Sequence, residues 1–179
     1  MKRVVILGIP GAGKSTFARK LAKKLDLPLI HLDRHFWSPG WKASSQEQFD
    51  ETLRELVSGD AWIMDGNYRR TIPHRLERAD TAVHLDVPRR TAMRRVLKRI
   101  ITYRNGGRPD MAEGCHERWF DRDFLRHIWR YHQDIHPEVV RHLEVFEERP
   151  DNQVVRLNGV REMDAWLERI STVEDSTLR

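Results

Sequence analysis

The residues with the clearest chemistry lie at positions 8–15, which read Gly-Ile-Pro-Gly-Ala-Gly-Lys-Ser. Their spacing matches the phosphate-binding loop, Gly, four residues, then Gly-Lys-Ser/Thr. Glycines allow a tight turn whose backbone N–H groups approach phosphate oxygens closely. Lys14 can neutralise the β- and γ-phosphates, the Ser15 hydroxyl can ligate Mg²⁺, and Thr16 can bond an α-phosphate oxygen. The residues expected to hold ATP are Gly8, Gly11, Ala12, Gly13, Lys14, Ser15 and Thr16.

The segments on either side of this loop have the patterns of a strand and a helix. Residues 3–7 form an apolar, β-branched run typical of a buried strand. Phe17, Leu21 and Leu25 then recur at helical spacing. Strand, glycine-rich turn and helix together direct a helix N-terminus at an anion.

Strand and helix patterns alternate along the rest of the chain. The predicted strands cover 3–7, 29–33, 61–64, 81–87 and 154–157. A possible capping box of Ser44 and Glu47 begins a helix that stops at Gly59, Pro88 opens another, and a helical stretch covers 121–148 with a bend near Pro137. The last helix runs through Trp166 and Ile170. This order predicts an α/β fold, a five-stranded parallel sheet with helices on both faces.

The candidate site residues follow these strands at their carboxyl ends, where ligands bind in open parallel sheets. They are Gly8, Asp33, Asp65, Asp86 and Asn158, and their convergence predicts one site, with Asn158 beside the nucleotide. Asp65 is expected to hold Mg²⁺ directly or through water; the alternative is a turn or helix cap. Asp33 can take a proton from an acceptor hydroxyl or orient that hydroxyl.

Positive charge is concentrated in one part of the chain. The net charge is +5, yet residues 69–130 hold 15 arginines and Lys98 against eight acidic residues. Arginine makes planar, two-pronged contacts with phosphate and carboxylate, so a polyanionic small molecule and a nucleic acid both remain possible partners. No helix-turn-helix, zinc-finger or RNA-binding signature supports DNA. For a small molecule, Arg69 would clamp the acceptor, Arg95 would reach the site, and a lid would draw on Arg99, Arg104, Arg108, Arg118 and Arg122.

Composition narrows the class further. Length predicts a single domain over 1–179, with an acceptor region at about 33–60, a lid insertion at about 104–122 and a frayed tail at 171–179. The single cysteine, Cys115, excludes an internal disulfide and favours a reducing, cytoplasmic compartment. Apolar runs are too short to span a membrane.

Four segments in the same order resemble adenylate kinases. Besides residues 8–16, they are Asp65-Gly66-Asn67-Tyr68-Arg69, Pro88 with Arg95 and Arg99, and Tyr131-His132-Gln133 with Pro137. The resemblance implies a P-loop kinase that uses ATP and Mg²⁺. Segments around Leu32-Asp33, Trp62–Tyr68 and Arg108–Cys115 are also similar to bacterial adenylate-kinase-like proteins labelled topology modulation (FlaR-like) proteins, a name that implies an effect on DNA.

Two departures from the adenylate kinase pattern bear on the acceptor. His127 stands where those enzymes have a catalytic arginine, and Leu32-Asp33-Arg34 replaces their acceptor-side Ser/Thr-Gly-Asp. The leading hypothesis is transfer of the ATP γ-phosphoryl group to a nucleotide, with Lys14, Asp33, Asp65, Arg69, Arg95 and Arg99 as catalytic residues. The alternatives are a kinase of a hydroxyl-bearing metabolite with Asp33 as base, a nucleotide-switched DNA regulator, and a simple ATPase.

Overall fold

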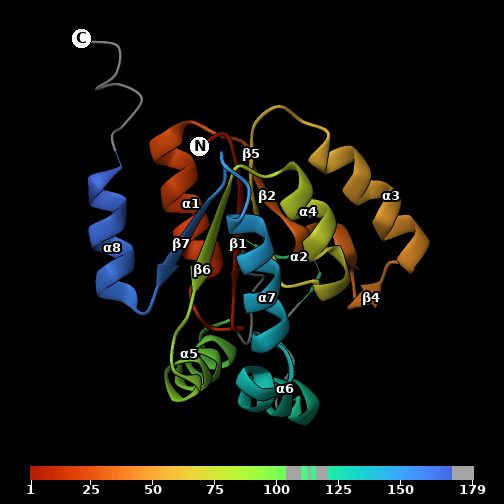
Figure 1. Ribbon diagram of the computed structural model, residues 1–179. Coiled ribbons are helices and arrows are strands. Elements are labelled where there is room, and N and C mark those ends of the chain that lie inside the picture. Colours follow the sequence, from red (N-terminus) through yellow and green to blue (C-terminus); the bar gives the residue numbers. More distant parts are fainter. Residues whose placement is uncertain (104–109, 113, 116–120, 171–179) are drawn as a thin grey trace.

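A computed structural model describes residues 1–103, 110–112, 114, 115 and 121–170 of the chain. Its centre is a five-stranded sheet in the order β2-β5-β1-β6-β7, and every neighbouring pair is parallel. The strands are β1 (Arg3–Gly8), β2 (Leu29–His31), β5 (Trp62–Asp65), β6 (Thr81–Leu85) and β7 (Gln153–Leu157). The predicted parallel α/β sheet is confirmed, and Figure 1 shows it at the heart of the molecule.

Helices cover both faces of this sheet. From β1 the chain crosses to β2 on one side, whereas from β5 it crosses to β6 and then β7 on the other. Right-handed crossovers therefore place α1 opposite α4 and α7. In Figure 1, α4 and α7 cross in front of the strands, while α1 lies beside α8. The main helices are α1 (Lys14–Leu25), α3 (Gln46–Val57), α4 (Ile72–Arg78), α5 (Arg89–Thr102), α6 (Arg122–Asp134), α7 (His136–Glu147) and α8 (Val160–Arg169).

The core is built on the central strands. Val4 to Leu7 of β1 and Ala82 to Leu85 of β6 are almost completely buried, because helices pack on both of their faces. Phe17 and Leu21 of α1 are buried on one side, and Val139, Leu143 and Phe146 of α7 are buried among the core residues as well. This packing holds the carboxyl edge of the sheet in place.

The second predicted strand is shorter than expected. It ends at His31, and a short helix, α2 (Leu32–Phe36), takes up the next residues, so Asp33 lies in a helical first turn and not at a strand end. Leu32 turns into the core, where its side chain packs against the backbone of Gly66. The capping box is also one residue later than predicted: Ser45 caps α3 with Gln48, because the Ser44 hydroxyl donates to the carbonyl of Phe36 at 3.0 Å.

Two further features were not expected from the pattern, and a third, the bend predicted near Pro137, is a complete break. A small antiparallel hairpin joins β3 (Trp37–Ser38) to β4 (Lys42–Ala43). A 3₁₀ turn, η1 (Arg69–Thr71), leads into α4. The predicted helix 121–148 is two helices that meet at the buried Ile135, where Pro137 in the first turn of α7 begins a new helix.

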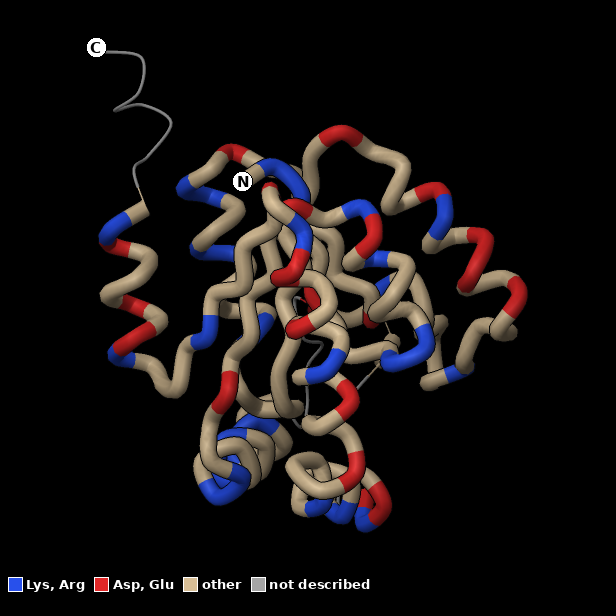
Figure 2. The backbone as a smooth tube through the Cα atoms, in the orientation of Figure 1, with Lys and Arg blue, Asp and Glu red and all other residues tan. Residues whose placement is uncertain are grey.

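Charge is distributed unevenly over the surface. Figure 2 shows lysines and arginines gathered on α5 and α6, next to the carboxyl edge of the sheet. Helix α5 contains arginines and one lysine without an acidic residue. Most of the expected lid, 104–122, lies outside the described residues, and the tail 171–179 lies wholly outside them. Among the described helices, none is long and apolar enough to cross a membrane.

Candidate active site

The phosphate-binding loop leads from β1 into α1 through backbone conformations that suit glycine. Gly11 and Gly13 have φ values of +87° and +100°. Gly13 is the N-cap of α1, and the first turn of that helix carries no acidic side chain. The Lys14 ammonium donates to the carbonyls of Gly8 and Ile9 at 2.8 and 3.2 Å. The open helix N-terminus, the amides and the lysine together make a cradle for an anion.

Helix α5 supports this cradle from the side. A Cβ atom at Gly11 would lie 2.5 Å from the carbonyl oxygen of Ala92, so the loop and α5 touch backbone to backbone. The Arg95 guanidinium donates to the carbonyl of Ala12 at 2.9 Å. The loop therefore receives both its shape and a nearby positive charge from α5.

A cavity of about 390 Å³ opens directly beside the loop. It joins the loop to two of the three aspartates predicted for the site, Asp33 and Asp65, and to two of the predicted arginines. The third, Asp86, is not among the lining residues and lies instead 3.2 Å from His132 Nε2. Among its lining residues are Gly11, Gly13, Lys14, Ser15, Thr16, Asp33, Asp65, Asn67, Arg95, Arg99 and Asp110. One cavity thus brings cationic, carboxylate and hydroxyl groups together at the carboxyl edge of the sheet.

Asp65 is held at the end of β5 by a histidine that the sequence analysis did not assign to the site. The parallel register sets His31 of β2 opposite Asp65. Both side chains are buried, and His31 Nδ1 lies 2.6 Å from Asp65 Oδ1. A buried carboxylate with a close polar partner has a defined orientation, as a metal ligand or an organiser of metal-bound water needs.

The oxygen donors of the cavity fit a magnesium ion bound together with phosphates. The Ser15 hydroxyl and the Asp65 carboxylate line the same space. Among the described residues, no group of three or more His, Cys, Asp or Glu side chains could hold a metal alone. Mg²⁺ in kinase sites is commonly bound by one or two protein oxygens plus substrate phosphates and water, and this donor set suits that arrangement.

Asp33 reaches the cavity from α2 and makes a specific contact. The Tyr68 phenol donates to Asp33 Oδ1 at 2.7 Å. Burial, together with the neighbouring Asp33 carboxylate, raises the pKa of Tyr68 well above its ordinary value, so the phenol remains the donor. The sequence analysis named Asp33 but did not foresee Tyr68, which stands 35 positions away.

The turn that carries Tyr68 is held from below by Arg75. This arginine is fully buried and donates to the carbonyl of Gly66 at 2.9 Å and to that of Tyr68 at 3.5 Å. Burial lowers the pKa of Arg75 to about 10, so it remains charged at neutral pH. No motif pointed to Arg75, because its role depends on contacts that form only in the fold.

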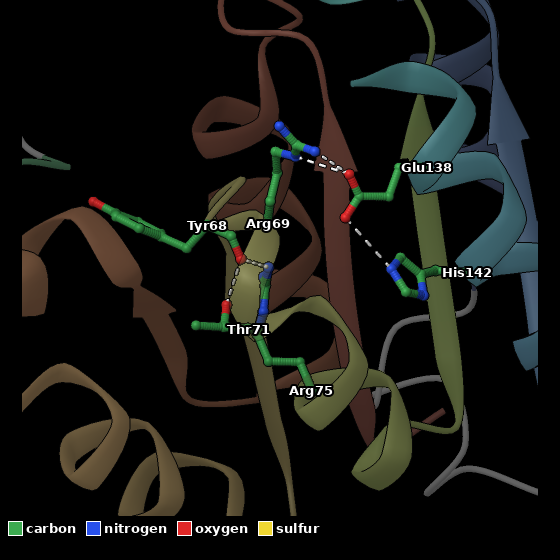
Figure 3. A network of polar contacts seen from close by, with 6 residues as sticks. All are labelled: Tyr68, Arg69, Thr71, Arg75, Glu138 and His142. Atoms are coloured by element: carbon green, nitrogen blue, oxygen red, sulfur yellow. Dashed lines mark hydrogen bonds and ion pairs between the residues drawn. The ribbon is translucent and has the colours of Figure 1, made fainter. Parts of the chain in front are cut away.

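Several predicted site residues do not reach the cavity. Figure 3 shows Arg69 directed toward Glu138 of α7, which it contacts through Nε at 3.0 Å, while the ring of Tyr68 points away from it. Exposed Arg122 is not among the lining residues, and the Asn158 side chain bonds Glu162 at 3.4 Å instead. Arg118, Arg104 and Arg108 lie outside the described residues.

A second, smaller hollow adjoins the loop on its other side, with a volume of about 230 Å³. On the side of the loop, this hollow is lined by Ala12, Gly13 and Thr16. Its remaining wall is largely apolar, from α1 and α8, and includes Phe17, Val160, Met163 and Leu167.

Fold and site together define a P-loop protein with the architecture of small-molecule kinases. A family model of the AAA domain matches residues 4–113, more than half of the chain, and the chain belongs to this family.

The curated relatives are matched over only part of their length. The adenylate kinase of Mycobacterium ulcerans is 41% identical over 83 residues, which are 45% of this chain and 42% of that protein. Threonine synthase-like 1 of Mus musculus is 26% identical over 148 residues, 74% of this chain and 19% of that protein. The chain therefore spans less than half the length of each of these relatives.

Solved structures match along almost the whole chain. Shikimate kinase from Acinetobacter baumannii, in complex with shikimate, has a TM-score of 0.57 at 17% identity and covers 100% of this chain and 96% of its own. Shikimate kinase from Bacteroides thetaiotaomicron has a TM-score of 0.52 at 17% identity, with 99% of each chain covered. These likenesses establish the fold, and the adenylate kinase resemblance seen in the sequence is confirmed; the topology modulation resemblance stays a prediction.

Proposed function

We propose that this protein transfers the γ-phosphoryl group of MgATP to a hydroxyl group of a small molecule. The observation that carries the proposal is the single cavity that joins Lys14 and Ser15 of the loop to Asp33. Phosphoryl transfer depends mainly on positioning and charge neutralisation, and this cavity offers both. A carboxylate opposite the phosphate cradle supplies the group that a hydroxyl acceptor needs.

On the donor side, the loop amides and Lys14 hold the β- and γ-phosphates, and Arg95 and Arg99 neutralise charge from α5. Ser15 and Asp65 would hold Mg²⁺, directly or through water, and the ion would withdraw charge from the phosphate oxygens. The apolar hollow between α1 and α8 suits a nucleobase, because it begins at Thr16, where the loop ends.

On the acceptor side, Asp33 accepts the proton of the acceptor hydroxyl. The oxygen of that hydroxyl bonds the γ-phosphorus, the bond from this phosphorus to the β–γ bridging oxygen breaks, and ADP leaves with the electron pair. The products are ADP and a phosphomonoester, and the proton passes from Asp33 to solvent. Full-length likeness to the fold of shikimate kinases, one of them in complex with shikimate, supports a hydroxyl acceptor.

A nucleoside monophosphate is the second candidate acceptor. The 41% identity to an adenylate kinase over 83 residues favours it. Two placements weigh against it: Arg69, the expected clamp for an anionic acceptor, pairs with Glu138 outside the cavity, and Asp33 would repel an incoming phosphate. The hydroxyl acceptor therefore agrees better with the geometry.

The substitution Asp33→Asn separates the two acceptors. It removes the base while keeping size and polarity, so transfer to a hydroxyl should fall by about a hundredfold or more. Transfer to AMP, which is already nucleophilic, should change much less. Turnover is measured with MgATP against a panel of sugars, polyols, shikimate, nucleosides and nucleoside monophosphates. Asp60→Asn, an exposed aspartate away from the cavity, is the matched control; wild-type turnover in Asp33→Asn would contradict the proposal.

A further inference from the structure

Asp33 is the last of a line of side chains that starts on the hairpin β3–β4. The Tyr68 phenol donates to Asp33 Oδ1 at 2.7 Å, and the Trp37 side chain lies near the same phenol. Because the indole N–H can only donate, it can approach this phenol only at the oxygen, while the phenol proton goes to Asp33. The hydrogen bond from Tyr68 to Asp33 therefore has a fixed direction.

The ring of Tyr68 is fixed by the aromatic residues around it. Its centroid lies 4.8 Å from that of Phe36 and 4.8 Å from that of Phe49. Phe36 also packs edge-on against Trp37, at 4.9 Å between centroids. Two aromatic neighbours, one from α2 and one from α3, thus leave the phenol little freedom, and the Asp33 oxygen that it contacts is restrained with it.

The hairpin is itself anchored by residues that come after the described part of α5. The amide of Gly40 donates to the carbonyl of Gly114 at 3.2 Å, and the buried Cys115 thiol donates to the carbonyl of Ser38 at 3.2 Å. Pro39 packs closely against Gly114. These contacts fix the hairpin strand from which Trp37 reaches Tyr68.

We propose that Tyr68 is the positioning residue of the acceptor base: its phenol, oriented by Trp37, fixes the Asp33 carboxylate toward the acceptor and keeps it ionised. The inference rests on the proposed function, because it gives Asp33 the role of base. A hydrogen bond to the charged form of a carboxyl favours that form, so Tyr68 lowers the pKa of Asp33 relative to the same site without the phenol.

Other charged groups around Asp33 contribute a constant background. Arg34 adjoins it on α2, and the charged groups that line the same cavity are Lys14 and Arg19 of α1, Asp65 of β5, Arg95 and Arg99 of α5, and Asp110. None of these groups is changed when the phenol oxygen of Tyr68 is removed. A change in the titration of Asp33 therefore reports the loss of the phenol itself.

The test is the substitution Tyr68→Phe, which keeps the ring and removes the donor. Carboxyl ¹³C NMR of protein labelled at aspartate follows the titration of Asp33, whose resonance is assigned by its loss in Asp33→Asn. We expect the pKa of Asp33 to rise by about one unit in Tyr68→Phe. We also expect turnover with the fastest hydroxyl compound of the panel to fall about tenfold, while the affinity for MgATP stays unchanged. In a plot of turnover against pH, the acidic limb should move to higher pH.

Two further variants keep the test decisive. Trp37→Phe, which removes only the indole donor, should shift the pKa of Asp33 in the same direction by a smaller amount. Tyr131→Phe is the matched control, because that buried hydroxyl has no hydrogen-bond partner among the described residues, and it should leave both readouts unchanged. An unshifted Asp33 pKa in Tyr68→Phe would overturn the inference, and if that variant does not fold, an unshifted pKa in Trp37→Phe would do so. Full turnover in Asp33→Asn would instead overturn the proposed function alone.

Discussion

Lys14 combines two contacts that show how the loop is prepared for phosphate. Its ammonium donates to the carbonyls of Gly8 and Ile9, so it is folded back over the loop and lies at the cavity wall. An incoming phosphate competes for the same ammonium and offers a full negative charge, which makes the stronger hydrogen bond. The lysine is therefore held where it is needed before the nucleotide arrives.

Replacing Lys14 by Ala should abolish transfer and weaken MgATP binding by about tenfold or more, because the charge on the β- and γ-phosphates is left unneutralised. Calorimetric titration with MgATP measures the affinity, and circular dichroism checks the fold. Lys23→Ala, an exposed lysine on the same helix, is the matched control. Equal affinities in Lys14→Ala and Lys23→Ala would show that the loop does not bind the nucleotide.

Residues whose role is local could be predicted from the sequence, and residues whose role depends on a distant partner could not. The loop, Asp65 and Arg95 were assigned to the site, since short motifs carry their chemistry. All of them line the cavity except Gly8 and Ala12 of the loop. Arg69 was expected there as well, but its long side chain pairs with Glu138, 69 positions further along. Tyr68 was passed over because Asp33 becomes its neighbour only through the fold.

At the level of elements, the site depends on the contact between the phosphate loop and α5. Gly11 has a positive φ and lies against the carbonyl of Ala92 and the side chain of Val96. Glycine alone satisfies both demands, since a Cβ atom would be strained by the backbone angle and would collide with α5. The contact also places Arg95 at the loop.

Gly11→Ala should consequently destabilise the protein by about 2 kcal/mol or more beyond the cost of Gly40→Ala. Gly40 also has a positive φ, but a Cβ atom there would meet nothing within 4 Å, so it isolates the backbone term. Urea unfolding of the two variants and the wild type gives both free energies. Equal losses in the two variants would mean that the loop does not need its close contact with α5.

The elements themselves were predicted unevenly, for a physical reason. Buried central strands such as β1 and β6 are continuous apolar runs, and the pattern identified them. The end of β2 was misplaced because Leu32 is buried by a turn toward Gly66 and not by continuation of the strand. The hairpin 37–43 was missed, since each of its strands has only two residues.

For the molecule as a whole, a buried histidine links stability to pH. His84 of β6 is nearly inaccessible, and burial lowers its pKa to about 4, with His136, Arg156 and His132 acting in the same direction and Asp86 opposing them. The unfolded chain binds this proton near pH 6.5, whereas the folded chain does not. The free energy of unfolding therefore has its full value above pH 6.5, and the contribution linked to His84 is lost as the pH falls toward 4.

Between pH 7 and pH 5, this histidine should cost about 2 kcal/mol of unfolding free energy. The substitution His84→Gln, which carries no titratable proton, should flatten that part of the pH dependence, whatever it costs in packing. His74→Gln, at an exposed position, should leave the slope as it is in the wild type. Urea unfolding at the two pH values measures the slopes, and an unchanged slope in His84→Gln would contradict the assignment.

In the whole molecule, the parallel sheet places the carboxyl ends of β1 and β5 at one edge, where α2 and α5 complete the cavity. The account's central claim is that a hydroxyl acceptor meets the γ-phosphate there. A direct measurement is ³¹P NMR of the wild-type protein with MgATP in a mixture of the hydroxyl panel and AMP. We predict a growing phosphomonoester resonance, distinct from that of AMP, whose amount equals the amount of ADP formed. Consumption of AMP to give ADP without a phosphomonoester, or release of inorganic phosphate alone, would contradict the account.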